Sequence, residues 1–209
     1  MARYILHGHF LSGPTYKVAL MLSLAQADWR FRLVDLRAGA HKSPEFLEMN
    51  RFGQVPALED GDLTLCQSGA ILEHLAIQTG RLGGTGQAEQ ARAREWIFWS
   101  FDVLSPGIFR SRAINAGFMK AGDEVKAHYH AMAERALGTL DAWLAGRGWL
   151  GGGDAPTIAD VDVAAVLHYA GDAGFDLADR QALKSHLDRV RALPGYLSPD
   201  GLQAKAQQG

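Results

Sequence analysis

A change in composition near residue 80 constrains the fold of this chain more than any other feature. Before that point, strand-like runs alternate with segments whose apolar residues recur at helical spacing. Strands are expected at 4–8 and 29–36 and in a later hairpin, and helices at 15–27, 43–50 and 68–80. Asp60-Gly61, a favoured two-residue turn, separates the two hairpin strands PALED and LTLC. The order strand–helix–strand–helix–strand–strand–helix predicts a small α+β domain with a mixed sheet.

Beyond a glycine-rich linker at residues 81–87, the sequence contains no strand-like run. Four helices are expected there, at 87–114, about 125–143, 157–171 and 179–193, and in the second of these helices apolar residues recur at spacings of three and four, which predicts a buried stripe. Pro106-Gly107 is a point where the first of them can kink. We therefore predict a first domain at 1–80, a linker at 81–87 and an all-helical domain at 88–209 whose last residues form a loose tail.

Composition excludes several classes of function. The 21 basic and 23 acidic residues give a net charge of −2 without a block of like charge, so no surface for nucleic acid or an anionic membrane is expected. The opening MARYILHGHF has too short an apolar run for a signal peptide, and no later run approaches the length of a membrane span. The one cysteine, Cys66, permits no internal disulfide and no cysteine-rich metal site. We expect a cytoplasmic protein without a metal.

Five short motifs resemble, in their order along the chain, those of the glutathione S-transferase superfamily. They are LSGPTYKVAL (11–20), GAHKSPEF (39–46), VPAL (55–58), QSGAILEHLA (67–76) and TIADVDVA (157–164). The first is similar to the start of helix one in serine-type, theta- and zeta-like members, and the last to a buried capping box of the helical domain. Each motif alone is weak, but the ordered set spans nearly the whole chain. The resemblance implies a thioredoxin-like N-terminal domain followed by an all-helical one.

The resemblance also implies a binding site for glutathione, the co-substrate of the family. Pro56 would be preceded by a cis peptide bond, so that Val55 offers its backbone N–H and C=O to the tripeptide as an added strand. The alternative is a trans-proline that begins an edge strand. His41 and Gln54 would bind the glycyl carboxylate, whereas we expect Lys42 to be an ordinary solvated residue.

Gln67 and Ser68 would bind the glutamyl end of glutathione. A serine at a helix start offers a hydroxyl, backbone N–H groups and the positive end of a helix dipole, which suit a carboxylate. The alternative for Ser68 is a plain helix cap without a ligand. Most relatives have an acidic residue where this chain has Gln67, and a neutral amide accepts from an ammonium group more weakly.

Ser12 is the expected catalytic residue. The thiolate, not the thiol, is the nucleophile, and a hydroxyl that donates to sulfur beside a helix start stabilises it. Ser12 matches the active serine of serine-type relatives, although Ser-Gly-Pro would also form a turn without a ligand. Thr15 is the alternative hydroxyl. No cysteine occurs within residues 10–16, and Cys66 is expected to be buried and inert.

The predicted function is addition of the glutathione thiolate to a small apolar electrophile by a homodimeric transferase. Alternatives are glutathione-dependent isomerisation or dehalogenation, as in zeta- and theta-like relatives, and a non-catalytic binding protein with the same fold. A serine hydrolase is disfavoured because the sequence lacks a Gly-x-Ser-x-Gly elbow. Residues available to line a second-substrate pocket, most of them better explained as core or dimer contacts, are Trp96, Trp99, Phe101, Phe109, Phe118, Met119, Arg110 and Arg112. Asp102 is a candidate to reach the ligand amine across a dimer interface.

Overall fold

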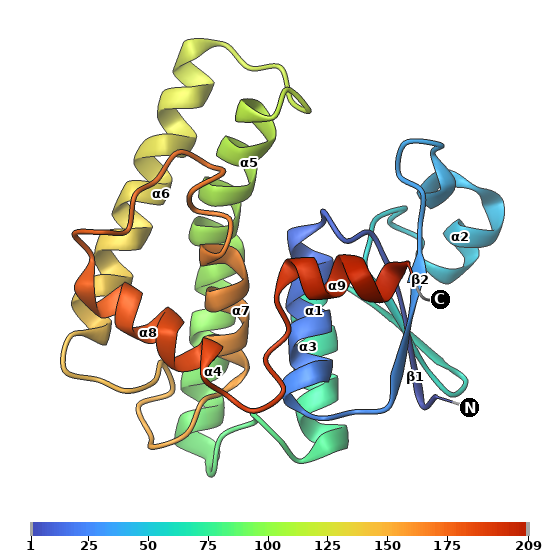
Figure 1. Ribbon diagram of the computed structural model, residues 1–209, viewed down its shortest axis with the longest axis horizontal. Helices are drawn as coiled ribbons and strands as arrows, with labels where there is room; N and C mark the ends of the chain where they lie inside the picture. The colour runs from blue at the N-terminus through green and yellow to red at the C-terminus, as the bar shows by residue number, and fades with distance from the viewer. Residues whose placement is uncertain (1, 208–209) are drawn as a thin grey trace. The chain divides into compact units, whose positions relative to one another are not determined.

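The structure is a computed structural model that describes residues 2–207, arranged in two compact units (Figure 1). The first unit consists of the chain up to Arg81 together with the segment that begins at Pro194. The second unit is Leu82–Leu193. The end of the chain, which the sequence analysis assigned to the helical domain, thus belongs to the first unit.

A four-stranded mixed sheet forms the centre of the first unit. Its strands are β1 (Tyr4–Gly8), β2 (Trp29–Leu33), β3 (Ala57–Asp60) and β4 (Leu63–Cys66), in the spatial order β2-β1-β3-β4. β1 runs parallel to β2 and antiparallel to β3, and β3 runs antiparallel to β4. Gly61, with φ of 62°, and Asp62 form the hairpin turn, one residue later than predicted, because Asp60 still pairs with Leu63. Glycine tolerates this positive φ at the first turn position.

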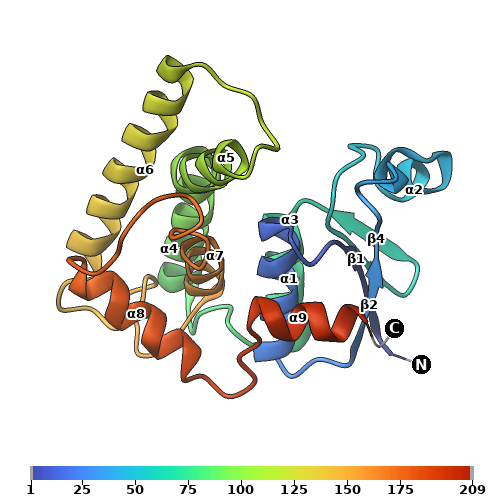
Figure 2. The same cartoon turned by 45° about the horizontal axis from the view of Figure 1, so that its top comes forward.

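Helices cover both faces of the sheet (Figure 2). The helical segments that precede Arg81 are α1 (Gly13–Leu24), the 3₁₀ turn η1 (Ala40–Lys42), α2 (Pro44–Met49) and α3 (Ser68–Thr79). α1 and α3 pack together on one face, where the alternate side chains of Tyr4 and Leu6 on β1 are buried, while α2 lies on the other side. Leu20, Leu72 and Leu75 are also fully buried there. The predicted thioredoxin-like fold is confirmed.

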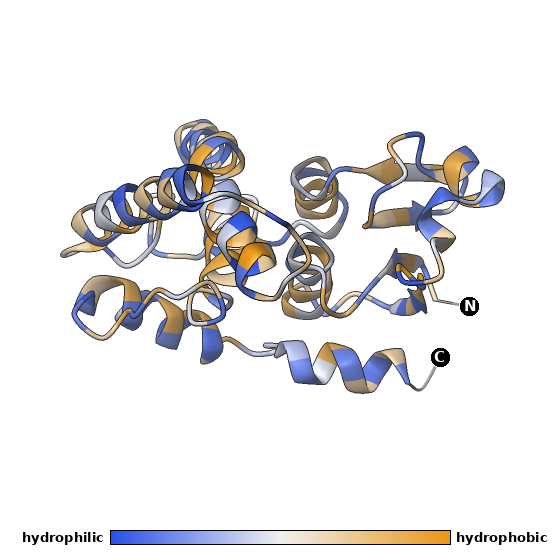
Figure 3. Cartoon of the chain, turned by 90° about the horizontal axis from the view of Figure 1, so that it is seen from above, coloured by the Kyte–Doolittle hydropathy of each residue, from blue (hydrophilic) through white to orange (hydrophobic). Residues whose placement is uncertain are grey.

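The second unit, Leu82–Leu193, consists of helices joined by loops and contains no strand among its described residues. Its helices are α4 (Gln87–Trp99), α5 (Ser105–Asn115), α6 (Asp123–Leu144), α7 (Ile158–Leu167) and α8 (Gln181–Arg191). Figure 3 shows hydrophilic residues on the outer side of α8, whose inner side buries Leu183, Leu187 and Val190. α7 is buried on all sides, which explains its nearly continuous apolar sequence. No helix among the described residues is long and apolar enough to cross a membrane.

The predicted kink near Pro106-Gly107 takes the form of a π-helical segment, Ser100–Leu104, between α4 and α5. Proline has no N–H to continue the helical ladder, which favours such an irregularity just before it. Gly107 then allows α5 to approach α6, since a Cβ there would lie 2.9 Å from the Cα of Ala133. The irregular turn is fixed by buried hydroxyls: Ser100 Oγ donates to Asp162 Oδ2 at 2.5 Å and lies 3.3 Å from Ser105 Oγ.

The predicted capping box at the start of α7 is present. The Asp160 carboxylate accepts from Thr157 N at 2.7 Å, from the Thr157 hydroxyl at 3.0 Å and from Leu150 N at 2.8 Å. Burial raises the pKa of Asp160 to about 6, against these hydrogen bonds, which lower it. The fully buried His186 ring has its Nδ1 3.8 Å from Asp160 Oδ1, and burial lowers the pKa of His186 to about 4.

His186→Leu is expected to make the protein less sensitive to acid. The folded pKa of His186 lies below its usual 6.5, so the folded state binds fewer protons and loses stability as pH falls from about 6.5 to 4. Asp160 has a raised pKa in the folded state, so its contribution to the stability increases as pH falls below about 6. Removing the imidazole should therefore cut the stability lost between pH 7 and pH 5 by about 2 kcal/mol. Urea unfolding at the two pH values measures this, and equal losses in wild type and variant would refute it.

The described part of the predicted loose tail forms a helix, and residues 208–209 of that tail lie outside the described residues. α9 (Pro199–Ala206) is capped by Ser198, whose Oγ accepts from Gly201 N at 3.1 Å. Leu202 is fully buried, and Lys205 Nζ lies 4.6 Å from the centre of the Trp29 ring. These contacts hold α9 against α1 and β2 in the first unit. Apolar spacing did not predict this helix, because Leu202 is its one buried residue and a single residue shows no period.

Candidate functional site

The sheet register brings the predicted binding segments to one edge of the first unit. Gly8, at the end of β1, pairs with Leu33 at the end of β2, and His7 pairs with Ala57 at the start of β3. Ala57 in turn pairs with Cys66, at the end of β4. Loops that follow β1, β2 and β4 and the loop that precedes β3 therefore leave the sheet at the same edge. These loops and the helical turns that follow them carry the seven predicted site residues: Ser12, His41, Gln54, Val55, Pro56, Gln67 and Ser68.

Ser12 is the N-cap of α1, at the end of the loop that follows β1. Its Oγ accepts from Thr15 N at 3.3 Å, so the cap that we gave as the alternative reading exists. A hydroxyl that accepts in this way keeps its proton available to donate elsewhere. Thr15 is fully buried against Gly8: a Cβ added at Gly8 would lie only 2.3 Å from the methyl carbon of Thr15. Of the two candidate hydroxyls, only Ser12 lies on a partly exposed residue.

The peptide bond between Val55 and Pro56 is cis, as the resemblance implied. The loop that leads to it is fixed by Asn50, a buried residue that the sequence analysis did not single out. Its Nδ2 donates to the carbonyl oxygen of Gln54 at 2.5 Å, and its Oδ1 accepts from Phe52 N at 3.0 Å. An asparagine just after a short helix is a common turn residue, so its sequence signal was unspecific.

Lys42 is exposed, as predicted for a solvated residue, but it also makes a contact that was not predicted. Its Nζ donates to the carbonyl oxygen of Gly53 at 2.7 Å, which ties η1 to the loop before Val55. His41, in the same turn, is half-buried, and its Nδ1 is a buried atom without a hydrogen-bond partner among residues 2–207. Gln54 is exposed, so its side chain is accessible at this edge. The two predicted glycyl-end residues thus lie on segments that Lys42 joins.

Ser68 is the first helical residue of α3 and not its cap. The N-cap position belongs to Gln67, which has φ of 70° and ψ of 113°, and in the described part of the chain no side chain caps this helix. A glutamine rarely adopts a positive φ, and such conformations concentrate at ligand sites. The Ser68 hydroxyl and the first N–H groups of α3 are therefore not committed to a cap. This overturns the reading of Ser68 as a plain cap.

Three nearby residues with reactive side chains have other roles. Cys66 is partly exposed rather than buried, its thiol lies 3.5 Å from the carbonyl oxygen of Met49, and burial raises its pKa, which keeps the thiol protonated. His7 pairs with Glu59 on the neighbouring strand. His9 accepts from Leu11 N at 3.2 Å, and burial lowers its pKa.

Two family models match most of this chain. The model described as "Glutathione S-transferase, N-terminal domain" matches residues 2–77, and that described as "Glutathione S-transferase, C-terminal domain" matches residues 110–194. The chain belongs to the glutathione S-transferase family. One curated relative is the disulfide-bond oxidoreductase YfcG of Escherichia coli (strain K12), which is 30% identical over 186 residues, 86% of each chain.

Solved structures of glutathione S-transferases have the same fold as this chain. The enzyme from Xanthobacter autotrophicus Py2 is 32% identical, with a TM-score of 0.86 over 96% of this chain and 98% of that one. Glutathione transferase URE2P8 from Phanerochaete chrysosporium, solved with oxidized glutathione, has a TM-score of 0.88 over 100% of this chain and 98% of that one. At 21% identity the second comparison shows the fold alone.

Among the residues suggested for the second substrate of this glutathione S-transferase, several have structural roles within the helical unit. Trp96 is buried, with its ring 5.1 Å from Trp99 and 5.5 Å from Trp143. Arg112 Nε donates to Asp172 at 3.1 Å. Among the remaining candidates, Phe118 and Asp102 are exposed. The burial of Trp96 and its contacts with Trp99 and Trp143 agree with the expectation that most of these residues are core contacts.

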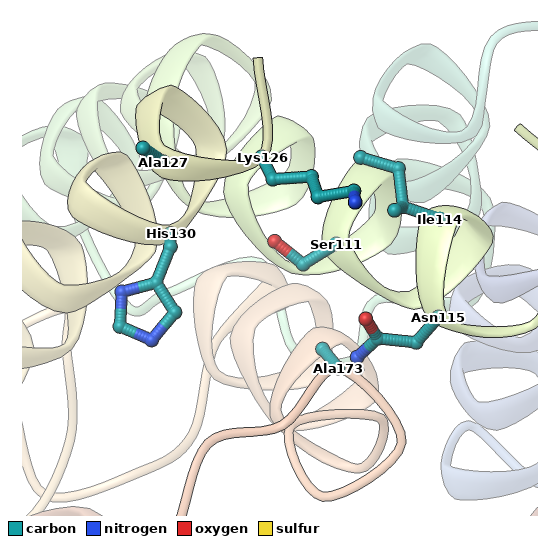
Figure 4. Close-up of a pocket in the computed structure, with 7 residues that line it drawn as sticks. All are labelled: Ser111, Ile114, Asn115, Lys126, Ala127, His130 and Ala173. Carbon is teal, nitrogen blue, oxygen red and sulfur yellow. The ribbon is translucent and has the colours of Figure 1, made fainter. Parts of the chain in front are cut away.

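A cavity of about 270 Å³ lies between α5 and α6 within the helical unit (Figure 4). It is lined by Ser111, Ile114, Asn115, Lys126, Ala127, His130 and Ala173. Its polar rim is engaged within the unit: the Lys126 ammonium pairs with Asp123, and the Asn115 amide donates to the carbonyl oxygen of Asp172. None of the aromatic residues suggested for the second substrate lines this cavity.

Proposed function

We propose that this protein is a glutathione transferase that ionises the glutathione thiol with Ser12 and adds it to a small apolar electrophile. The observation that carries the proposal is the partly exposed Ser12 hydroxyl at the start of α1, at the same sheet edge as the Val55-Pro56 cis bond. The family match, and the oxidized glutathione held by the URE2P8 structure, support glutathione as the co-substrate.

In this proposal glutathione lies extended along the edge of the sheet. Its backbone pairs with the N–H and C=O of Val55 as an added strand. The glutamyl carboxylate meets the uncapped N-terminus of α3, where the Ser68 hydroxyl and the first N–H groups provide donors, while Gln67 accepts from the amine. The glycyl carboxylate lies toward His41 and Gln54, on segments held together by Lys42.

The thiol then lies beside Ser12. A hydroxyl that donates to sulfur, together with the positive end of the α1 dipole, favours the thiolate. Lowering the thiol pKa by about two units from its usual 8.5 corresponds to about 2.7 kcal/mol of differential stabilisation. The complete burial of Thr15 supports Ser12 over the alternative hydroxyl. The thiol proton passes to solvent when the thiolate forms, because the Ser12 hydroxyl donates a hydrogen bond and accepts no proton. The sulfur electron pair then forms a bond to the electrophilic carbon of the second substrate. In an addition the resulting carbanion takes a proton from solvent, and in a substitution the leaving group departs with the electron pair of its own bond.

Retention on immobilised glutathione, followed by turnover of a generic aromatic electrophile, tests the proposal. Retention with turnover is the expected result. Retention without turnover would support the non-catalytic binding protein, and no retention would refute the proposal. A chlorinated substrate and a maleyl-type isomerisation substrate, assayed in parallel, separate the dehalogenase and isomerase alternatives. A small disulfide substrate tests the reaction named for the YfcG relative.

We also propose that the enzyme acts as a homodimer in the cytoplasm. A single partly exposed thiol, Cys66, suits a reducing compartment. Exposed apolar side chains such as Ile77 on α3 and Phe98 on α4 are available for contact between copies. Sedimentation of the purified protein at micromolar concentration measures the oligomeric state, and a monomer would refute the dimer.

Ser68→Ala is expected to weaken glutathione binding about tenfold, the effect of one lost hydrogen bond to a charged group. The melting temperature should change little, because Ser68 does not cap α3. Isothermal titration calorimetry and thermal unfolding measure the two quantities. Thr79→Val is the matched control: it removes a hydroxyl from the other end of α3, where Oγ1 donates to Leu75 O at 2.6 Å, and should leave affinity unchanged. Unchanged affinity in Ser68→Ala would remove Ser68 from the site.

A further inference from the structure

The last described residues of the chain, 195–207, form what we call the C-terminal strap. The family matches end at residues 77 and 194, so the strap lies outside both of them. It nevertheless belongs to the first unit, where α9 lies beside α1 and β2 (Figures 1 and 2). The strap is therefore a part of the glutathione-binding unit that the family models do not describe.

The strap is hydrogen-bonded to both ends of α1. Near the C-terminal end of that helix, Ser23 Oγ donates to the carbonyl oxygen of Gly195 at 2.6 Å. Near the N-terminal end, the Tyr16 hydroxyl donates to the carbonyl oxygen of Leu197 at 2.8 Å and lies 3.4 Å from the Tyr196 hydroxyl. The strap thus contacts a side chain from the last turn of α1, Ser23, and the long side chain of a residue from its first turn, Tyr16.

Close packing shows that this contact is specific. Gly195 has φ of 85°, and a Cβ there would lie 2.6 Å from the carbonyl oxygen of Ser23, so only glycine fits. Tyr16 is 1% exposed, so its hydroxyl is enclosed by protein and bonded within it. Farther along, the fully buried Leu202 and the contact of Lys205 with the Trp29 ring hold α9 in place.

Tyr16 connects the strap to Ser12. The backbone N–H of Tyr16 donates to the carbonyl oxygen of Ser12 at 2.9 Å, and the N–H of Thr15 donates to Ser12 Oγ at 3.3 Å. Tyr16 therefore lies one helical turn after the proposed catalytic residue and closes the first hydrogen bond of α1. The first turn of a helix frays most readily because its N–H groups lack helical partners.

We propose that Tyr16 and the C-terminal strap position the Ser12 hydroxyl for the glutathione thiol, an inference that rests on the proposed function. The bond from Tyr16 to Leu197 O holds the first turn of α1 against a second, independently docked segment. A catalytic hydroxyl must stay within about 0.5 Å of its productive position, so fraying of this turn weakens its bond to sulfur. The groups proposed to bind the rest of glutathione lie in the loop after β2, in the loop before β3 and at the start of α3, and they do not depend on this turn.

Tyr16→Phe, which keeps the ring and removes the hydroxyl, tests the proposal. The thiol pKa of bound glutathione, read from thiolate absorbance, should rise by about one unit. At a pH below the thiol pKa of both wild type and variant, this rise leaves about tenfold less thiolate in the variant. kcat should fall by a similar factor while the KM for glutathione stays within about twofold, since the binding groups are elsewhere. Amide hydrogen exchange at Thr15 and Tyr16 should become faster.

Ser23→Ala is the matched control, because it removes the other strap bond, at the end of α1 distant from Ser12. It should leave the thiol pKa and the exchange at residues 15 and 16 unchanged. An unchanged thiol pKa in Tyr16→Phe, or an equal rise in both variants, would overturn the proposal, because the strap would then only stabilise the unit. If wild type binds glutathione without forming thiolate, the proposed function fails, and the exchange rates alone decide whether the strap orders the first turn.

Discussion

Ser12→Ala is expected to raise the thiol pKa of bound glutathione by about two units and to lower turnover at pH 7 about 20- to 30-fold. The thiolate loses the hydroxyl that donates to it, and two units of pKa correspond to about 2.7 kcal/mol. With the thiol pKa near 8.5, only a few per cent of the bound thiol is ionised at pH 7. Affinity for glutathione should change little, because the backbone of Val55 and the start of α3 bind the rest of the molecule. Thiolate absorbance across a pH series measures the shift.

Two controls separate this effect from the role of Ser12 as a helix cap. Ser43→Ala removes a cap of the same kind, since Ser43 Oγ accepts from Phe46 N at 3.2 Å at the start of α2. It should cost about 1 kcal/mol of stability without moving the thiol pKa. Thr15→Val removes the buried alternative hydroxyl. If Ser12→Ala left absorbance and turnover unaltered while Thr15→Val changed both, the catalytic hydroxyl would be that of Thr15.

Asp160→Ala is expected to lower the free energy of unfolding by about 3–5 kcal/mol. The variant removes the acceptor of three hydrogen bonds and leaves the N–H groups of Leu150 and Thr157 buried without a partner. Thr157 also caps α7, the helix buried on all sides at the centre of its unit, so the loss affects the core directly. Urea unfolding monitored by tryptophan fluorescence measures the change, since in that unit the Trp96 ring packs against the rings of Trp99 and Trp143.

Asp172→Ala is the matched control in the same helical unit. Asp172 pairs with Arg112 at 3.1 Å, but its side chain is 62% exposed, so its loss should cost at most about 1 kcal/mol. Asp160→Asn should lower the free energy of unfolding by less than Asp160→Ala and by more than Asp172→Ala, because an amide keeps one of the two acceptor oxygens. Equal destabilisation by Asp160→Ala and Asp172→Ala would show that the capping box contributes no more than a surface ion pair.

The spacing of apolar residues predicted the strands and most helices of both units, although not α9, because burial of one face of a helix or strand imposes a period that the sequence must carry. The capping box of α7 was predicted because Thr157 and Asp160 interact over three residues. The hairpin was predicted, but its turn lies one residue later than expected, because Asp60 pairs with Leu63 as the last residue of β3. The cis bond and the glutathione-binding positions came from the resemblance to the family and not from spacing.

Long-range contacts could not be predicted in the same way. Asn50 and Lys42 fix the loop before Val55 by bonding to backbone carbonyl groups, and such bonds leave no pattern in the sequence. The register of the four strands decides that Ser12, Val55 and Gln67 lie at one edge. A shift of one residue would have turned the alternate side chains of each strand to the other face.

The sequence by itself determined most of the local elements and the candidate hydroxyls, because each depends on residues within a few positions of one another. It also determined the family, because five short motifs occur in a fixed order along the chain. Only the tertiary structure decided that Thr15 is buried, that Ser68 does not cap α3, and that the end of the chain docks on α1. Those outcomes depend on which surfaces meet after folding. A hydrogen bond between Tyr16 and Leu197, 181 residues apart, has no local signal, since nothing near either residue specifies the other.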